Sequence, residues 1–197
     1  MLLDRSFRLA FASFSTLFVV VAAVTLPAQI GLAAAFRDEI TVRNLTPDIR
    51  TFPEHRQVHR VGRAQLAEYR FAYWSLTALE ILLLPLFAGA ARRVIEVDGS
   101  GAVATAPDAW AHSLGRAKMA APADAAPLVV AAAVSVAVGV LCRQIGMLLV
   151  EPISPSAAYL GVGAAEGLAR AAAAPFFLAA WTCSARGPAA EDAPEPR

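Results

Sequence analysis

Four long stretches of apolar residues dominate the chain, and polar segments separate them. They run over residues 9–36, 71–91, 128–150 and 157–181. A transmembrane helix needs ~20 mostly apolar residues, and each stretch is at least that long. None alternates apolar and polar residues as a barrel strand does, and in a bilayer only helices and closed barrels satisfy their own backbone. The pattern predicts an all-α fold, an integral membrane four-helix bundle.

The first stretch has some features of a secretory signal peptide, because Arg5 and Arg8 precede it and small residues end it. Its apolar run is much longer than the ~7 to 15 residues of a cleavable signal. We therefore predict an uncleaved signal-anchor helix. Pro27 either bends this helix or marks its end, because a proline removes a backbone hydrogen-bond donor.

The first connection, residues 37–70, carries a helix-start signal. Thr51 and Glu54 have the spacing of a capping box, which predicts a helical extension in the first loop that runs into the second span. His55 and His59 are spaced i, i+4 and share one helix face, as a metal pair requires. Two ligands do not make a site, so these histidines are weak candidates and we predict no metal. A solvated polar face and a surface for anionic head groups are the alternatives.

The second connection and the C-terminal tail are rich in Ala and Pro. Thr105 and Asp108 again have capping spacing, which predicts a short interfacial helix anchored by Trp110. Residues 184–197 have no apolar face, and we expect them to form a disordered tail. The sequence thus indicates one four-span transmembrane domain, residues 1–183, followed by this tail.

Composition agrees with a membrane protein and names no ligand. The 197 residues are 57% hydrophobic and 17% charged, and 17 basic against 16 acidic residues give a net charge of +1. No excess of one sign points to nucleic acid as a partner. The two cysteines, Cys142 and Cys183, are too few for a disulfide framework, and no apolar stretch contains a histidine that could ligate haem. We predict no cofactor.

Lysine and arginine counts on the two sides of the predicted spans are nearly equal, eight against seven. The sequence ARRV directly follows the second span, however, whereas the connection EPISPSA carries no positive charge. Positive residues concentrate in cytoplasmic loops. We therefore predict a multi-pass protein with both termini on the cytoplasmic side.

Charged residues inside the apolar stretches are the candidates for a functional site. They are Glu80, Arg143, Glu166 and Arg170, with Gln144 close by. Each costs at least ~2.5 to 3.5 kcal/mol at the middle of a bilayer, so such residues face the bundle interior and pair. Counted from the ends of antiparallel spans, the first three lie about 10 to 14 Å from the same face, at 1.5 Å per residue.

The spacing predicts a definite set of ion pairs. Glu166 and Arg170 are in the favourable order for an i, i+4 pair. Arg143 is then free to bridge Glu80 and Glu166 with its planar guanidinium. One interpretation is a neutral cluster that joins the second, third and fourth spans. A second is a wet cavity that serves a proton, an ion or a polar ligand, and a third is that the charges face a partner subunit.

Small residues predict close helix packing on two spans. Gly163 and Gly167 form a GxxxG pattern continued by Ala171, and Ser135 and Gly139 have the same four-residue spacing on the third span. Small residues at this spacing allow two helix backbones to approach closely. The packing is either internal to the bundle or the seam of a homodimer.

The sequence favours a structural role over an enzymatic one. It contains no P-loop, GxSxG or HExxH motif and no connection long enough for a separate catalytic domain. We expect a structural or accessory subunit of a membrane complex, whose partners are the lipid bilayer and other membrane subunits or a second copy. The alternatives are a transporter or channel component that uses the Glu/Arg cluster, and an intramembrane enzyme that acts on a lipid or quinone.

Overall fold

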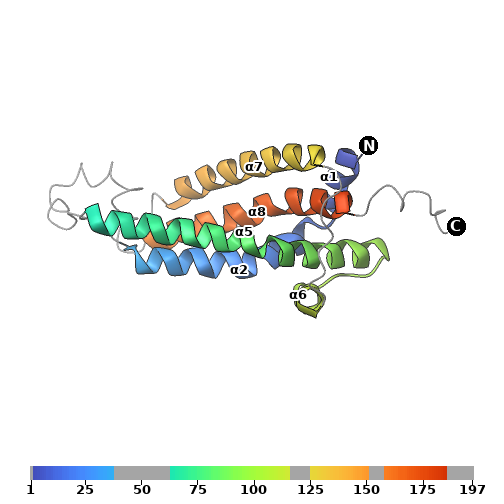
Figure 1. The fold of residues 1–197 in the computed structure, drawn as a ribbon, viewed down its shortest axis with the longest axis horizontal. Coiled ribbons are helices and arrows are strands. Elements are labelled where there is room, and N and C mark those ends of the chain that lie inside the picture. Colours follow the sequence, from blue (N-terminus) through green and yellow to red (C-terminus); the bar gives the residue numbers. More distant parts are fainter. Residues whose placement is uncertain (1, 38–62, 116–124, 151–157, 186–197) are drawn as a thin grey trace. The chain divides into compact units, whose positions relative to one another are not determined.

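The computed structural model describes residues 2–37, 63–115, 125–150 and 158–185. Within these ranges the chain forms six α-helices and no strand, so the predicted all-α fold is confirmed. The helices are α1 (Leu2–Ala12), α2 (Phe14–Ala35), α5 (Arg63–Gly99), α6 (Ala106–Gly115), α7 (Ala126–Val150) and α8 (Ala158–Ala185) (Figure 1).

Four of these helices, α2, α5, α7 and α8, are long and apolar enough to cross a membrane. The count agrees with the four predicted spans. It rests on helix length and on composition, because about 20 apolar residues at 1.5 Å per residue match the ~30 Å hydrocarbon core of a bilayer. By these two criteria the chain is a multi-pass, membrane-embedded protein.

The first apolar stretch differs from the prediction at its start, and one of the two alternatives for Pro27 is excluded. The helix that can span a membrane begins at Phe14 rather than Leu9, and Ser13 separates it from α1. The physical reason is that α1 is amphipathic, with Asp4 and Arg8 forming an exposed ion pair of 2.8 Å. Pro27 does not end α2, which continues to Ala35, because one lost donor interrupts only one bond of the helix ladder.

The second predicted span is longer at both ends than its apolar stretch. Helix α5 runs from Arg63 to Gly99, so the helix continues beyond the predicted residues 71–91 in both directions. Its first turns are the described part of the helical extension predicted for the first loop. The predicted tail began at Ser184, but Ser184 and Ala185 are the last residues of α8, and Ser184 is buried. Three other predictions fall outside the described residues: the helix start at Thr51, the pair His55 and His59, and the tail over residues 186–197.

The chain divides into two compact units. Unit 1 comprises Met1–Val21, Leu83–Gly139 and Ala171–Arg197, and unit 2 comprises Ala22–Leu82 and Val140–Arg170. Helices α1 and α6 belong to unit 1, whereas each of the four long helices contributes one part to each unit. The packing of each unit is described separately.

In unit 1, two phenylalanines of α1 and the first residue of α2 pack around one phenylalanine of α8. The ring centroids of Phe7, Phe11 and Phe14 lie 6.1, 5.5 and 6.2 Å from that of Phe176. Aromatic pairs at these separations add to the stability gained from burying their surface. The buried hydroxyl of Ser13 donates a hydrogen bond to Asp98 of α5, so the junction of α1 and α2 is also tied to α5.

Helix α6 confirms the short helix predicted in the second connection, and it packs on α5 within unit 1. The N–H of Asp108 donates to the Thr105 hydroxyl at 3.4 Å, as in an N-cap. The Ser113 hydroxyl donates to the Leu86 carbonyl at 2.6 Å, and the Trp110 ring lies 5.4 Å from that of Phe87. Trp110 therefore contacts a residue of the protein itself.

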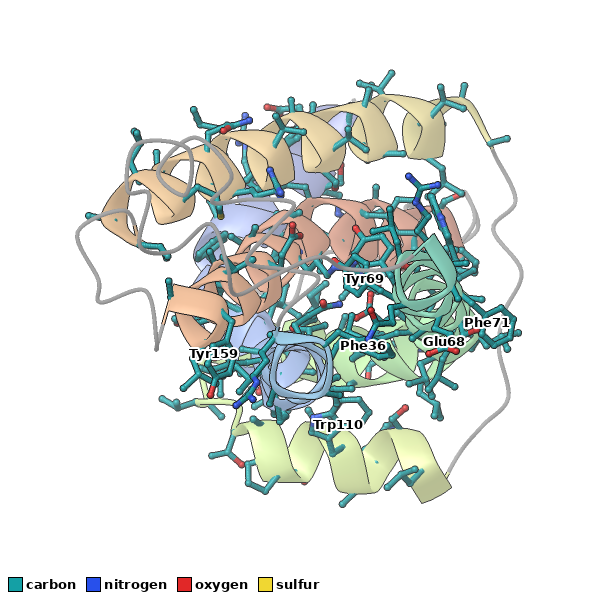
Figure 2. All side chains as sticks on the ribbon, turned by 90° about the vertical axis from the view of Figure 1, so that its left-hand side faces the viewer. Phe36, Glu68, Tyr69, Phe71, Trp110 and Tyr159 are labelled. Atoms are coloured by element: carbon teal, nitrogen blue, oxygen red, sulfur yellow. The ribbon has the colours of Figure 1, made fainter. Side chains whose placement is uncertain are left out.

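In unit 2, α8 approaches α2 closely at two glycines. A Cβ atom added at Gly163 would lie 2.7 Å from the Cβ of Ala33, and one added at Gly167 would lie 2.7 Å from the Cα of Leu26. Beside this contact, the ring of Phe36, directly after α2, lies 5.7 Å from that of Tyr69 on α5, whereas Phe71 points outward from α5 (Figure 2). Unit 2 thus places small residues where two helix backbones meet.

This close approach predicts opposite effects for two Gly→Ala substitutions. Gly167→Ala is expected to lower the free energy of unfolding by about 1 to 3 kcal/mol, because the new methyl group meets backbone atoms of α2. The matched control is Gly31→Ala, where no atom lies within 4 Å of the added Cβ. It should be neutral or stabilise the helix by up to about 1 kcal/mol. Circular dichroism during titration with a denaturing detergent measures both, and equal effects would contradict the packing.

Candidate functional site: the ion pairs of unit 2

The best-buried ion pair of unit 2 joins α5 to α8. Nη1 of Arg170 donates to Oε2 of Glu80, and only 20% and 15% of the two side chains are exposed. The two residues are 90 positions apart in the chain. Because both side chains have left water almost completely, the pair must compensate most of its own desolvation cost.

A single face of α5 surrounds the guanidinium of Arg170. Its Nη2 donates to the Thr77 hydroxyl at 3.4 Å, and its central carbon lies 5.4 Å from the centre of the Tyr73 ring, a cation–π distance. The Thr77 hydroxyl in turn donates to the Tyr73 carbonyl at 2.9 Å. Tyr73, Thr77 and Glu80 follow one another at spacings of four and three, which places them on one side of a helix.

Helix α2 supplies the second partner of Glu80, which the sequence analysis missed. Nε2 of Gln29 donates to Oε1 of Glu80 at 3.2 Å, and Gln29 is only 2% exposed. One turn earlier, the buried Thr25 hydroxyl donates to the Gly167 carbonyl at 3.1 Å. The sequence did contain a signal for this contact. Thr25 and Gln29 are polar residues spaced i, i+4 within an otherwise apolar stretch, and residues at this spacing share one face of a helix.

A second ion pair joins α7 to α8. Nε of Arg143 donates to Oε1 of Glu166, with 35% and 17% of the side chains exposed. The helices approach closely nearby, because a Cβ atom added at Gly146 would lie 2.8 Å from the Cβ of Ala165. This pair is more open than the pair of Glu80 and Arg170.

The predicted pairing of these four residues is right for Arg143 with Glu166 and wrong for Arg170 and Glu80. Glu166 and Arg170 were expected to pair within α8, with Arg143 bridging Glu80 and Glu166, but each arginine pairs with a single carboxylate on another helix. An i, i+4 pair contributes only about 0.3 to 0.5 kcal/mol. This contribution is smaller than that of the contacts that Arg170 makes with Glu80, Thr77 and Tyr73 on α5.

The other predicted residues lie apart from these pairs. The side chain of Gln144 is exposed on α7. In unit 1, Ala171 is fully buried, Gly139 is half-buried, and the hydroxyl of Ser135 is buried without a hydrogen-bond partner in the described part of the chain. Of the five residues predicted to mediate packing, Gly163 and Gly167 lie at the contact with α2.

Metal ligands do not gather in the described ranges. Within residues 2–37, 63–115, 125–150 and 158–185, no group of three or more His, Cys, Asp or Glu side chains could hold a metal ion. Cys142 and Cys183 are half-buried. The weak candidates His55 and His59 lie outside these ranges.

Chemically, the four charged groups form a neutral and mutually compensated set. Two carboxylates meet two guanidiniums, and an amide and a hydroxyl complete the coordination of Glu80 and Arg170. Such a set resists separation of the helices, because removing one partner leaves an uncompensated buried charge.

No protein-family model matches the chain, and neither a search of curated proteins nor one of solved structures found a match. The geometry of unit 2 therefore provides the basis for assigning a role.

The two ion pairs should differ in their contribution to stability. Arg170→Ala is expected to cost about 3 to 5 kcal/mol, because it leaves the buried carboxylate of Glu80 without its charged partner. Glu166→Gln should cost about 1 kcal/mol, because the guanidinium of Arg143 that it leaves without a carboxylate is 35% exposed and better solvated. Unfolding in a denaturing detergent, followed by circular dichroism, measures both values.

A double variant tests the cause of that loss. Glu80→Gln combined with Arg170→Ala removes both charges, so it should be no less stable than Arg170→Ala alone. Two results would contradict this account. One is a double variant whose loss of unfolding free energy equals the sum of the two single losses, and the other is an equal loss at the two ion pairs.

Proposed function

We propose that this protein is a small polytopic membrane protein that acts as a structural or accessory subunit of a membrane complex. The observation that carries the proposal concerns the charge cluster of unit 2, which consists of Glu80, Arg143, Glu166 and Arg170. Each of these charged groups has a partner of opposite sign within the chain. Glu80 and Arg170 also use neighbouring polar groups for their own coordination. Charged groups that are all paired with groups on other helices suit a role in holding the helices together.

The proposal places these charges within the membrane-spanning parts of the helices. Glu80, Glu166 and Arg170 lie on helices that are long and apolar enough to span a bilayer, and Arg143 lies on a third. A single charge at that depth costs at least ~2.5 to 3.5 kcal/mol. Pairing across helices offsets this cost only in the assembled fold, which makes the cluster a condition for correct association of the helices.

The outer surfaces of unit 2 suit contact with lipid. Large apolar side chains are exposed on α5 and α7, among them Phe71, Trp74 and Leu148. Tryptophan and tyrosine gather at the two borders of a bilayer, and Tyr73 and Trp74 lie near the start of the apolar stretch of α5. The proposal includes the topology predicted from the sequence, with both termini in the cytoplasm.

A transporter or channel component is the second candidate, and one observation favours it. Arg143 is 35% exposed, so the pair that it forms with Glu166 is the part of the cluster that a ligand or an ion can reach. The third candidate, an intramembrane enzyme acting on a lipid or quinone, depended on the same cluster and on His55 and His59. Those histidines lie outside the described residues and add no support.

Replacement of Glu166 by Gln separates the first two candidates. In a structural subunit, the loss of the Arg143 partner should lower the yield of folded protein or the recovery of a stoichiometric partner in mild detergent. Glu68→Gln is the matched control, because Glu68 is an exposed carboxylate of α5 in the same unit and should have no effect. If Glu166→Gln assembles normally but loses flux or ligand binding in liposomes, the transporter assignment replaces the structural one.

A further inference from the structure

One face of α7 within unit 2 is exposed along its whole length. Its large residues are aliphatic: Val140, Leu141, Ile145, Leu148 and Leu149. Gln144 lies among them and is also exposed. It follows Val140 and precedes Leu148 by four residues each, so the three share a face of the helix.

The amide of Gln144 has no hydrogen-bond partner among the described residues, unlike the amide of Gln29, which donates to Glu80. Gln144 lies six residues before the end of α7 at Val150, about 9 Å along the helix at 1.5 Å per residue. Lipid chains offer neither donors nor acceptors, and an unpaired amide in such surroundings is unfavourable. Lipid alone is therefore a poor neighbour for this position.

The exposed face of α5 in unit 2 provides a comparison. Between Phe71 and Leu82 this face carries Phe71, Trp74, Leu79 and Leu82, which suit lipid, and the exposed polar residue in this range is Ser75. A helical serine can donate to the carbonyl four residues earlier, so it requires no partner outside its helix. The amide of Gln144 makes no such bond to its own helix in the described part of the chain. The exposed face of α5 between Phe71 and Leu82 therefore lacks the polar mismatch with lipid that Gln144 creates on α7.

We propose that this face of α7 binds a second copy of the chain, with Gln144 paired to its counterpart across a two-fold axis. A carboxamide carries both donors and an acceptor, so it is complementary to itself. In a two-fold interface each residue can meet its own copy, and glutamine pairs of this kind join transmembrane helices. The proposal goes beyond the proposed function and does not depend on it.

Charge also favours a second copy over a charged partner. Arg143 is adjacent to Gln144 in the sequence, but Glu166 of the same chain compensates its charge. Two copies therefore meet without an uncompensated charge, whereas a helix with an additional carboxylate would bring one. The surrounding Val, Ile and Leu side chains supply the packing contacts.

The experiment measures association of the full-length protein in liposomes. Two populations labelled with donor and acceptor dyes are mixed over a range of protein-to-lipid ratios, and energy transfer reports dimers. Wild-type protein should dimerise, and Gln144→Leu should weaken association about 5- to 30-fold, the effect of losing an interhelical hydrogen bond of ~1 to 2 kcal/mol. Gln144→Asn keeps the amide and should retain most of the association.

A matched pair of leucines controls for the choice of face. Leu148→Ala on α7 should weaken association, whereas Leu82→Ala on α5 should not, although the two leucines are similarly exposed, at 68% and 73%. Unchanged circular dichroism and unfolding of Gln144→Leu show that the monomer fold is intact. Wild-type protein that stays monomeric at every density, or Gln144→Leu that associates as wild type does, overturns the proposal.

A second measurement tests whether lipid or a different protein, rather than a second copy, covers this face of α7. A photoreactive amino acid at position 148 in native membranes should yield a covalent product with the mass of two chains. Products with lipid alone, or with a different protein and no second copy, would refute self-association through α7.

Discussion

The ion pair between Glu80 and Arg170 is the interaction on which the arrangement of unit 2 depends. It joins two helices across 90 residues of sequence, and both side chains are mostly buried. The face of α5 formed by Tyr73, Thr77 and Glu80 surrounds the guanidinium, and Gln29 of α2 holds the remaining carboxylate oxygen. A buried charge of this kind tolerates few alternative arrangements, because each of them would leave a charge uncompensated.

Helix α8 makes this arrangement possible, because a short segment of it contacts all three other helices of unit 2. Gly163 and Gly167 allow α2 to approach, Glu166 pairs with Arg143 of α7, and Arg170 pairs with Glu80 of α5. The glycines and the charged residues of α8 therefore contribute to helix packing in different ways. The glycines set how close the backbones can come, and the ion pairs set which side chains must meet when they do.

The two units join their helices with different emphases. Unit 2 uses two ion pairs of mostly buried carboxylates together with polar side chains. Unit 1 packs aromatic rings around Phe176 and holds α6 on α5 with the contact of Trp110 with Phe87 and an ion pair of 3.0 Å between Arg93 and Asp108. The polar residues of unit 1 that cross between helices include Ser13 and Ser113, which donate to Asp98 and to the Leu86 carbonyl. Among the described residues, the exposed Gln144 and the buried hydroxyl of Ser135 lack a partner of this kind.

The sequence by itself determined the class of the fold, the number of long apolar helices and the residues that carry charge within them. These properties follow from local composition and periodicity, which a single segment contains in full. The short helix α6 was also predictable, because its cap at Thr105 is a local signal. The division at Ser13 was not, since α1 and α2 are separated within one nearly continuous apolar stretch.

Only the tertiary structure decided which charges pair and which polar residues join them. The pairing expected from spacing within α8 was wrong, and Gln29 was missed, because both depend on how α2, α5, α7 and α8 are rotated about their own axes. That rotation is set by the packing of small side chains, as at Gly163 and Gly167, between helices that are distant in sequence. A local pattern can identify a charge that needs a partner, but the partner is selected where the helices meet.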